Sequence, residues 1–151
     1  MRLATAAALA PLIVLSPAAE AAADLSIAAP IAGSWTYSAV SDGSEAAFAS
    51  SGGAVQLSVH CTRATRRIAI AKPSGAAATA MDIWTSGATR SVPVTYNAAT
   101  ARLTADFGAY DNLLDGLANS RGRIGFTVGT QPPLVVPAWP EVARVIEDCR
   151  A

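Results

Sequence analysis

Residues 55–61 read Val-Gln-Leu-Ser-Val-His-Cys and form the clearest β-strand pattern of the chain, because apolar and polar side chains alternate along them. Successive side chains of a strand point to opposite faces. Val55, Leu57, Val59 and Cys61 are therefore predicted to face a core, and His60 to face solvent. This stretch predicts a sheet with one buried face.

Segments with similar alternation lie on both sides of this strand, at residues 35–39, 45–50, 68–70, 78–85, 89–96, 103–107, 123–128 and 134–136. Asp42-Gly43 and Ser86-Gly87 supply hairpin turns, since glycine tolerates positive φ. Pro93 has no N–H, so its strand is expected at a sheet edge or at a bulge. Short strands at this spacing predict antiparallel β structure.

Two segments have a helical period instead. Asp111 is a predicted N-cap for a short helix that ends before Gly122 and buries Leu113, Leu114 and Leu117. A second helix begins at Pro140, and its apolar stripe at i, i+3, i+4 and i+7 consists of Val142, Val145, Ile146 and Cys149. The predicted fold class is α+β: mainly an antiparallel β-sheet or sandwich, with one short inserted helix and a C-terminal helix packed on the sheet.

The N-terminus has the pattern of an export signal. Arg2 precedes an apolar run from Leu3 to Leu15, and residues 21–23 are alanines that suit cleavage. We predict a signal peptide at residues 1–23, a flexible lead-in at 24–33 and a single β-rich domain at 34–151. No later segment reaches the roughly 20 apolar residues that span a bilayer. The expected location is periplasmic or secreted, without a stable membrane anchor after cleavage; an uncleaved anchor is the alternative.

Cys61 and Cys149 both fall on predicted core faces, one on a strand and one on a helix. Two cysteines in an oxidising compartment are expected to pair. We predict a disulfide between them, which would hold the C-terminal helix against the strand of residues 55–61. Two buried free thiols are the alternative.

Charge and composition exclude several classes of function. The full chain has 11 basic and 11 acidic residues, and removal of Arg2 and Glu20 with the signal leaves ten of each, so the net charge stays at zero. Such a chain has no field that attracts nucleic acid. One histidine and two cysteines are too few for a zinc site, and no phosphate-binding loop is present. We therefore predict no metal, no cofactor and no nucleic-acid partner.

Three sets of residues are candidates for function. Asp111 and Asp115, one helical turn apart, could act as the acid and base of a small hydrolase, but we favour helix capping and solvation as their role. A basic cluster of Arg63, Arg66, Arg67 and Lys72 could bind an anionic partner or form a solvated connection. Of the three tryptophans, Trp35, Trp84 and Trp139, we expect Trp84 to be the best exposed. The candidate partner surface is Trp84, Arg63, Arg66 and Arg67.

Several short motifs resemble those of small uncharacterised exported proteins of alphaproteobacteria. They are Gly33-Ser34-Trp35, residues 57–61, the segment 111–117 and Trp139-Pro140-Glu141 ahead of Cys149. The chain also resembles, more distantly, the invasion-associated locus B family, whose members are exported, β-rich and cysteine-bearing. The resemblance implies an exported β-rich domain.

These observations favour a non-enzymatic binding or accessory protein of the periplasm, with a protein partner in the cell envelope. A narrower alternative is an inhibitor of a periplasmic or secreted enzyme. A small hydrolase that uses Asp111 and Asp115 is the enzymatic alternative.

Overall fold

The computed structural model describes residues 24–151, and the predicted signal peptide at residues 1–23 lies outside the described residues. The elements follow the order β1 (Gly33–Val40), β2 (Gly43–Ser50), β3 (Val55–Thr62), η1 (Arg63–Thr65), β4 (Arg67–Pro73), β5 (Ala80–Trp84), β6 (Thr89–Pro93), β7 (Thr95–Asn97), β8 (Arg102–Gly108), α1 (Asn112–Ala118), β9 (Arg123–Thr127), β10 (Leu134–Pro137) and α2 (Pro140–Arg150).

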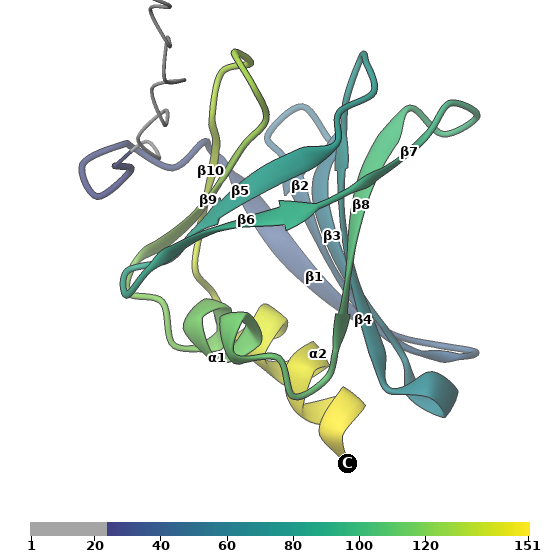
Figure 1. Cartoon of the computed structure of the whole chain (residues 1–151). Coiled ribbons are helices and arrows are strands. Elements are labelled where there is room, and N and C mark those ends of the chain that lie inside the picture. Colours follow the sequence, from purple (N-terminus) through teal and green to yellow (C-terminus); the bar gives the residue numbers. More distant parts are fainter. Residues whose placement is uncertain (1–23) are drawn as a thin grey trace, which may run out of the picture.

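The strands form two antiparallel sheets that face each other (Figure 1). The larger sheet has the order β1-β2-β3-β4-β8-β7, and the smaller has the order β10-β9-β5-β6. Both helices cover one end of the space between the sheets, at the bottom of Figure 1. The predicted fold class, antiparallel β with an inserted helix and a C-terminal helix packed on a sheet, is confirmed.

The sheets are joined at two places, but they do not close into a barrel. The predicted strand 89–96 is divided at Val94, so that β6 lies at the edge of the small sheet and β7 at the edge of the large one. Pro93 ends β6 and therefore does occupy an edge strand, as its missing N–H requires. At the other join, the Ile31 N–H donates to the carbonyl of Val135 at 2.9 Å.

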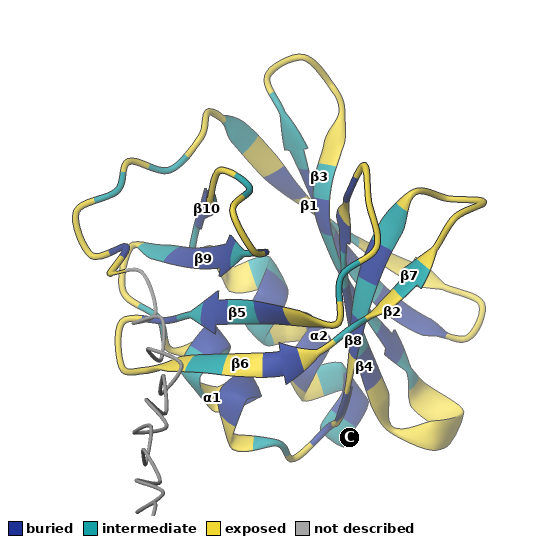
Figure 2. Ribbon diagram, turned by 45° about the horizontal axis from the view of Figure 1, so that its top comes forward, coloured by how far each residue is buried: buried dark blue, intermediate teal, exposed yellow. Residues whose placement is uncertain are grey.

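The core lies between the two sheets and the two helices, and Figure 2 shows the buried residues in dark blue. Leu57, Val59 and Cys61 are buried there, as the alternation predicts. Val55 is 39 % exposed and does not belong to this core. It pairs with Ala49 just beyond an irregularity in the register between β2 and β3, where the regular pairing ends.

Helix α2 lies on the inner face of the large sheet and contacts β1, β2, β3 and β4. Its predicted apolar stripe is buried, and consists of Val142, Val145, Ile146 and Cys149. Cys61 and Cys149 form a disulfide, with their Cα atoms 5.6 Å apart. The predicted bridge and the predicted position of the C-terminal helix are both confirmed. No helix within residues 24–151 is long and apolar enough to cross a membrane.

The first hairpin needs its glycine for a reason other than the expected one. Gly43 is the first residue of β2 and pairs with Val40, so Ser41 and Asp42 make the turn. Its φ is not positive. A Cβ at this position would instead collide with the backbone carbonyl oxygen of Cys61 on β3. Close approach of two strands therefore requires the glycine.

The lead-in of residues 24–33, expected to be flexible, lies against β9 and β10. The buried side chain of Leu25 sits over Gly125, where a Cβ would collide with it. The guanidinium of Arg123 donates to the carbonyl of Ala28. This segment therefore forms part of the packed domain.

Candidate functional site

Asp111 and Asp115, the two carboxylates proposed as an acid and base, each form an ion pair with an arginine. Asp111 caps α1, because its Oδ1 accepts from the Leu113 N–H at 2.8 Å, and the same oxygen lies 2.8 Å from Nη2 of Arg90. Asp115 Oδ1 lies 2.8 Å from Nη1 of Arg150. These contacts attach α1 to β6 on one side and to α2 on the other. The geometry matches the capping interpretation.

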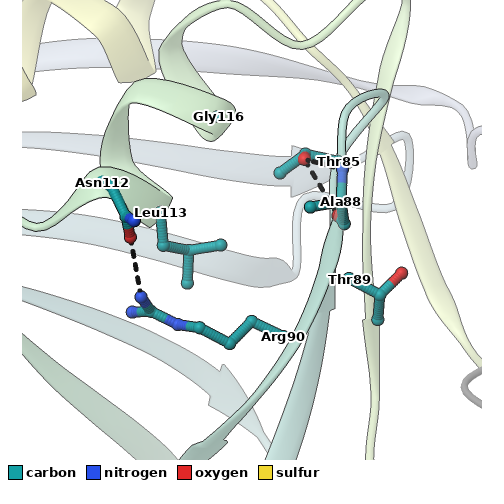
Figure 3. A pocket seen from close by; sticks show the side chains of 7 residues that line it. All are labelled: Thr85, Ala88, Thr89, Arg90, Asn112, Leu113 and Gly116. Atoms are coloured by element: carbon teal, nitrogen blue, oxygen red, sulfur yellow. Dashed lines mark hydrogen bonds between the residues drawn. The ribbon is translucent and has the colours of Figure 1, made fainter.

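A shallow pocket of about 260 Å³ lies between the β5–β6 hairpin and α1 (Figure 3). It is lined by Thr85, Ala88, Thr89, Arg90, Asn112, Leu113 and Gly116. Most of its polar groups already have partners: Thr85 Oγ1 donates to the Ala88 carbonyl at 3.0 Å, and Arg90 Nη1 donates to Asn112 Oδ1 at 3.0 Å. The pocket therefore presents a mainly apolar surface, and its volume is below that of a typical small-molecule site.

The predicted partner surface is divided between two sheets. Arg63, Arg66 and Arg67 are exposed around η1, at the connection between β3 and β4 of the large sheet. Trp84 ends β5 in the small sheet and is half-buried. Trp139, 42 % exposed, is more accessible than Trp84, and Trp35 is buried. The four predicted residues therefore do not share one surface.

Arg66 connects the β3–β4 turn to the C-terminus of the chain. Its φ of 49° ends η1 in the left-handed region. Its guanidinium donates to the Tyr110 hydroxyl at 3.3 Å and to the backbone oxygen of Ala151 at 3.5 Å. These bonds indicate a structural role for this arginine.

Lys72 does not belong to the basic cluster in which the sequence placed it. It follows Ile68 and Ile70 on the inward row of β4 and is only 7 % exposed. Its Nζ donates to the carbonyl of Pro73 at 3.2 Å, and no carboxylate of residues 24–151 forms an ion pair with it. Burial lowers the pKa of this amine below its usual 10.5. The alternation of the strand could have revealed its position.

His60 faces outward, on the opposite side of β3 from Cys61. Its Nε2 lies 3.0 Å from Asp42 Oδ2, and its Nδ1 lies 3.6 Å from Glu45 Oε2. No group of metal-ligating side chains is present among the described residues. The histidine thus bridges two acids near the β1–β2 turn.

The sheet edges form a further candidate site, which the sequence reasoning missed. Three of the four sheet edges formed by residues 24–151 are protected. Strand β7 has only three residues, β6 contains Arg90 and Pro93, and β10 contains Pro137 and accepts the N–H of Ile31 at the Val135 carbonyl. Such features prevent pairing with another chain. Edge strand β1 differs, since its eight residues include no charge and no proline.

Comparisons with protein-family models, with curated proteins and with solved structures gave no match to this chain. The candidate site therefore rests on geometry and chemistry. Among the described residues, β1 is the long edge strand that contains neither a charged residue nor a proline.

Proposed function

We propose that this chain is an exported, non-enzymatic binding or accessory protein of the bacterial periplasm, and that it binds a protein partner of the cell envelope. The observation that carries the proposal is the open edge of β1 beside three protected edges. A long edge presents unpaired N–H and C=O groups, and extended segments of other proteins recognise such groups by adding a strand.

The compartment is supported by two independent features. Residues 1–23 have the pattern of an export signal. The Cys61–Cys149 disulfide is characteristic of proteins that fold in an oxidising compartment. The resemblance to small uncharacterised exported proteins agrees with both.

Binding is favoured over hydrolysis by the state of the acidic residues. Asp111 and Asp115, the proposed catalytic pair, are each bound to an arginine. A general acid or base must instead reach the substrate proton that it transfers. These two side chains serve the attachment of α1.

Site-specific crosslinking in the periplasm tests the proposal. A photoreactive amino acid at exposed Ala39, at the open edge, is expected to capture one envelope protein, and the captured protein should co-purify with the unmodified full chain. The matched control carries the same group at exposed Thr100, between β7 and β8. Failure of the full chain to retain any protein would refute the binding role.

Inhibition of a periplasmic or secreted enzyme is a narrower form of this function. The exposed end of β1, including Ala39, presents extended backbone of the kind that can pair with a second protein. Incubation with lysozymes and secreted metalloproteases tests it directly, since unchanged activity of these enzymes would count against inhibition.

A further inference from the structure

The free backbone groups of β1 follow from the hydrogen bonds just before the strand. The carbonyl of Ala32 accepts from the Ser51 N–H, toward β2, whereas the N–H of Ile31 points the other way, to Val135. Backbone groups of successive strand residues alternate in direction. The N–H and C=O of Gly33, Trp35, Tyr37 and Ala39 therefore point away from β2.

Half of this edge has no neighbouring strand in the described part of the chain. Near the start of β1, Trp35 Nε1 donates to the Pro137 carbonyl at 2.8 Å, so the end of β10 lies close by. Beyond Tyr37, residues 24–151 leave the strand uncovered: Ser38, Ala39 and Val40, which face both sides of the sheet, are all exposed. An incoming strand can reach the outward groups of Tyr37 and Ala39 without displacing another element.

A cation lies directly beside this free half. The guanidinium carbon of Arg144, on α2, lies 3.7 Å from the centre of the Tyr37 ring. The Tyr37 hydroxyl donates to Asp148 Oδ2 at 2.6 Å, which fixes the ring against the helix. Arg144 is exposed and forms no ion pair with residues 24–151. Its charge therefore remains available to a ligand.

We propose that β1 pairs with an extended segment of a partner protein that places an Asp or Glu side chain opposite Tyr37, next to Arg144. This inference rests on the proposed binding function and names the chemistry of the partner. Directly opposed residues of an antiparallel pair have their Cβ atoms about 4.5–5.5 Å apart. A carboxylate opposite Tyr37 thus comes within reach of the guanidinium stacked on that ring.

Charge also argues against a second copy of this chain as the occupant. Strand β1 contains no acidic residue that it could place opposite Tyr37 of another copy. A two-fold pairing of β1 with itself would bring two Arg144 side chains close together, and like charges across a strand pair are destabilising. A segment of another protein that contains an acidic residue supplies the carboxylate opposite Tyr37 and brings no second Arg144 close to the first.

The test uses the full disulfide-bonded chain and a synthetic probe. The probe is an end-blocked peptide of about nine alternating valine and threonine residues with one central glutamate, and its control has glutamine at that position. In a titration followed by amide NMR, the N–H signals of Tyr37 and Ala39 should shift more than those of Thr36 and Ser38, which bond to β2. The glutamine peptide should bind about two- to fivefold more weakly. No preferential shift at Tyr37 and Ala39 would refute the inference.

Two variants and a matched control identify the contacts. Ala39→Pro removes an outward N–H and no bond to β2, so the domain should fold while peptide affinity falls by about tenfold or more. Ala39→Val keeps the N–H and should bind as the native chain does. Arg144→Gln should abolish the difference between the two peptides. If Ala39→Pro binds like Ala39→Val, the edge is not the site.

Other outcomes separate this inference from the function on which it rests. If the full chain retains an envelope protein but the glutamate and glutamine peptides bind equally, the binding function stands and the acidic partner is refuted. Concentration-dependent dimers in sedimentation, abolished by Ala39→Pro, would identify a second copy as the occupant and overturn the proposal.

Discussion

Reduction of the Cys61–Cys149 disulfide is expected to lower the free energy of unfolding by about 2–4 kcal/mol. The two residues are separated by 88 positions, and closing a loop of that length in the unfolded chain corresponds to about 4.6 kcal/mol in the chain-entropy model. Residual structure in the unfolded chain reduces this figure. Both cysteines are fully buried, so the reduced thiols still fill the core as small apolar groups.

The reduced domain should nevertheless remain folded, because α2 keeps other attachments. Its buried stripe includes Val142, Val145 and Ile146, and Asp148 accepts a hydrogen bond from Tyr37. Urea unfolding with and without a phosphine reductant, followed by tryptophan fluorescence, measures the loss. The control is a variant with both cysteines replaced by alanine, which the reductant should not affect. A loss below about 1 kcal/mol would refute the entropic reasoning.

Three further changes test the packing and electrostatics of the domain. Lys72→Met is expected to raise the free energy of unfolding by about 1–2 kcal/mol at pH 7, because it removes a buried cation without an ion-pair partner. The pKa of Lys72 in the folded domain lies below 10.5, so the unfolded chain binds this proton more tightly. Native stability should therefore rise relative to the variant as the pH increases from the lowered folded pKa to about 10.5, and level off above it; a pH-independent difference in urea unfolding would contradict this. Gly43→Ala should destabilise the domain by about 1–3 kcal/mol, because its Cβ meets the Cys61 carbonyl. Gly52→Ala, whose Cβ would have only an ordinary contact with Ser50 Oγ at 4.0 Å, should be nearly neutral in the same assay. Asp111→Ala should lower the free energy of unfolding by about 0.5–2 kcal/mol through loss of the α1 cap. Asp111→Asn retains a capping oxygen and should lower it less. Equal decreases for the two variants would assign the effect to the contact with Arg90.

The parts of the fold that follow a local period could be predicted from the sequence. Alternation placed Cys61 on a buried strand face, and helical spacing placed Cys149 on a buried stripe. The disulfide then follows from their meeting in one core. Contacts between segments that are far apart in the sequence produce no periodic pattern from which they could be predicted. Leu25 packs over Gly125 because that glycine has no side chain, and nothing around Leu25 in the sequence signals its partner.

Sheet membership was the main feature that alternation could not predict. Residues 89–96 alternate in the same way whether they form one strand or two, and the change of sheet at Val94 depends on which strands lie beside them. The open edge was missed for the same reason. The sequence predicts a strand at residues 35–39 and shows that it has no charge, but only the strand order shows that one side stays unpaired.

The candidate residues show the same limit for charged groups. The spacing of Asp111 and Asp115 puts them on one short helix, but it cannot show that Arg90 and Arg150 reach them from β6 and α2. Lys72 is the opposite case, since two preceding isoleucines on alternate positions already indicated its inward direction. It was predicted to belong to an exposed basic cluster because it is positively charged and follows three arginines in the sequence.

The disulfide and the open edge are connected through α2. Cys149 fixes the last turn of this helix to β3, and the preceding residue, Asp148, holds the Tyr37 ring over which Arg144 lies. The same helix therefore carries the covalent attachment and the cation of the proposed docking site. Because no strand of residues 24–151 lies beside the free half of β1, α2 is what orients the inward side chain of Tyr37 there. In this arrangement the bridge, together with the buried stripe of α2, holds the helix that carries the charge an acidic partner segment would meet.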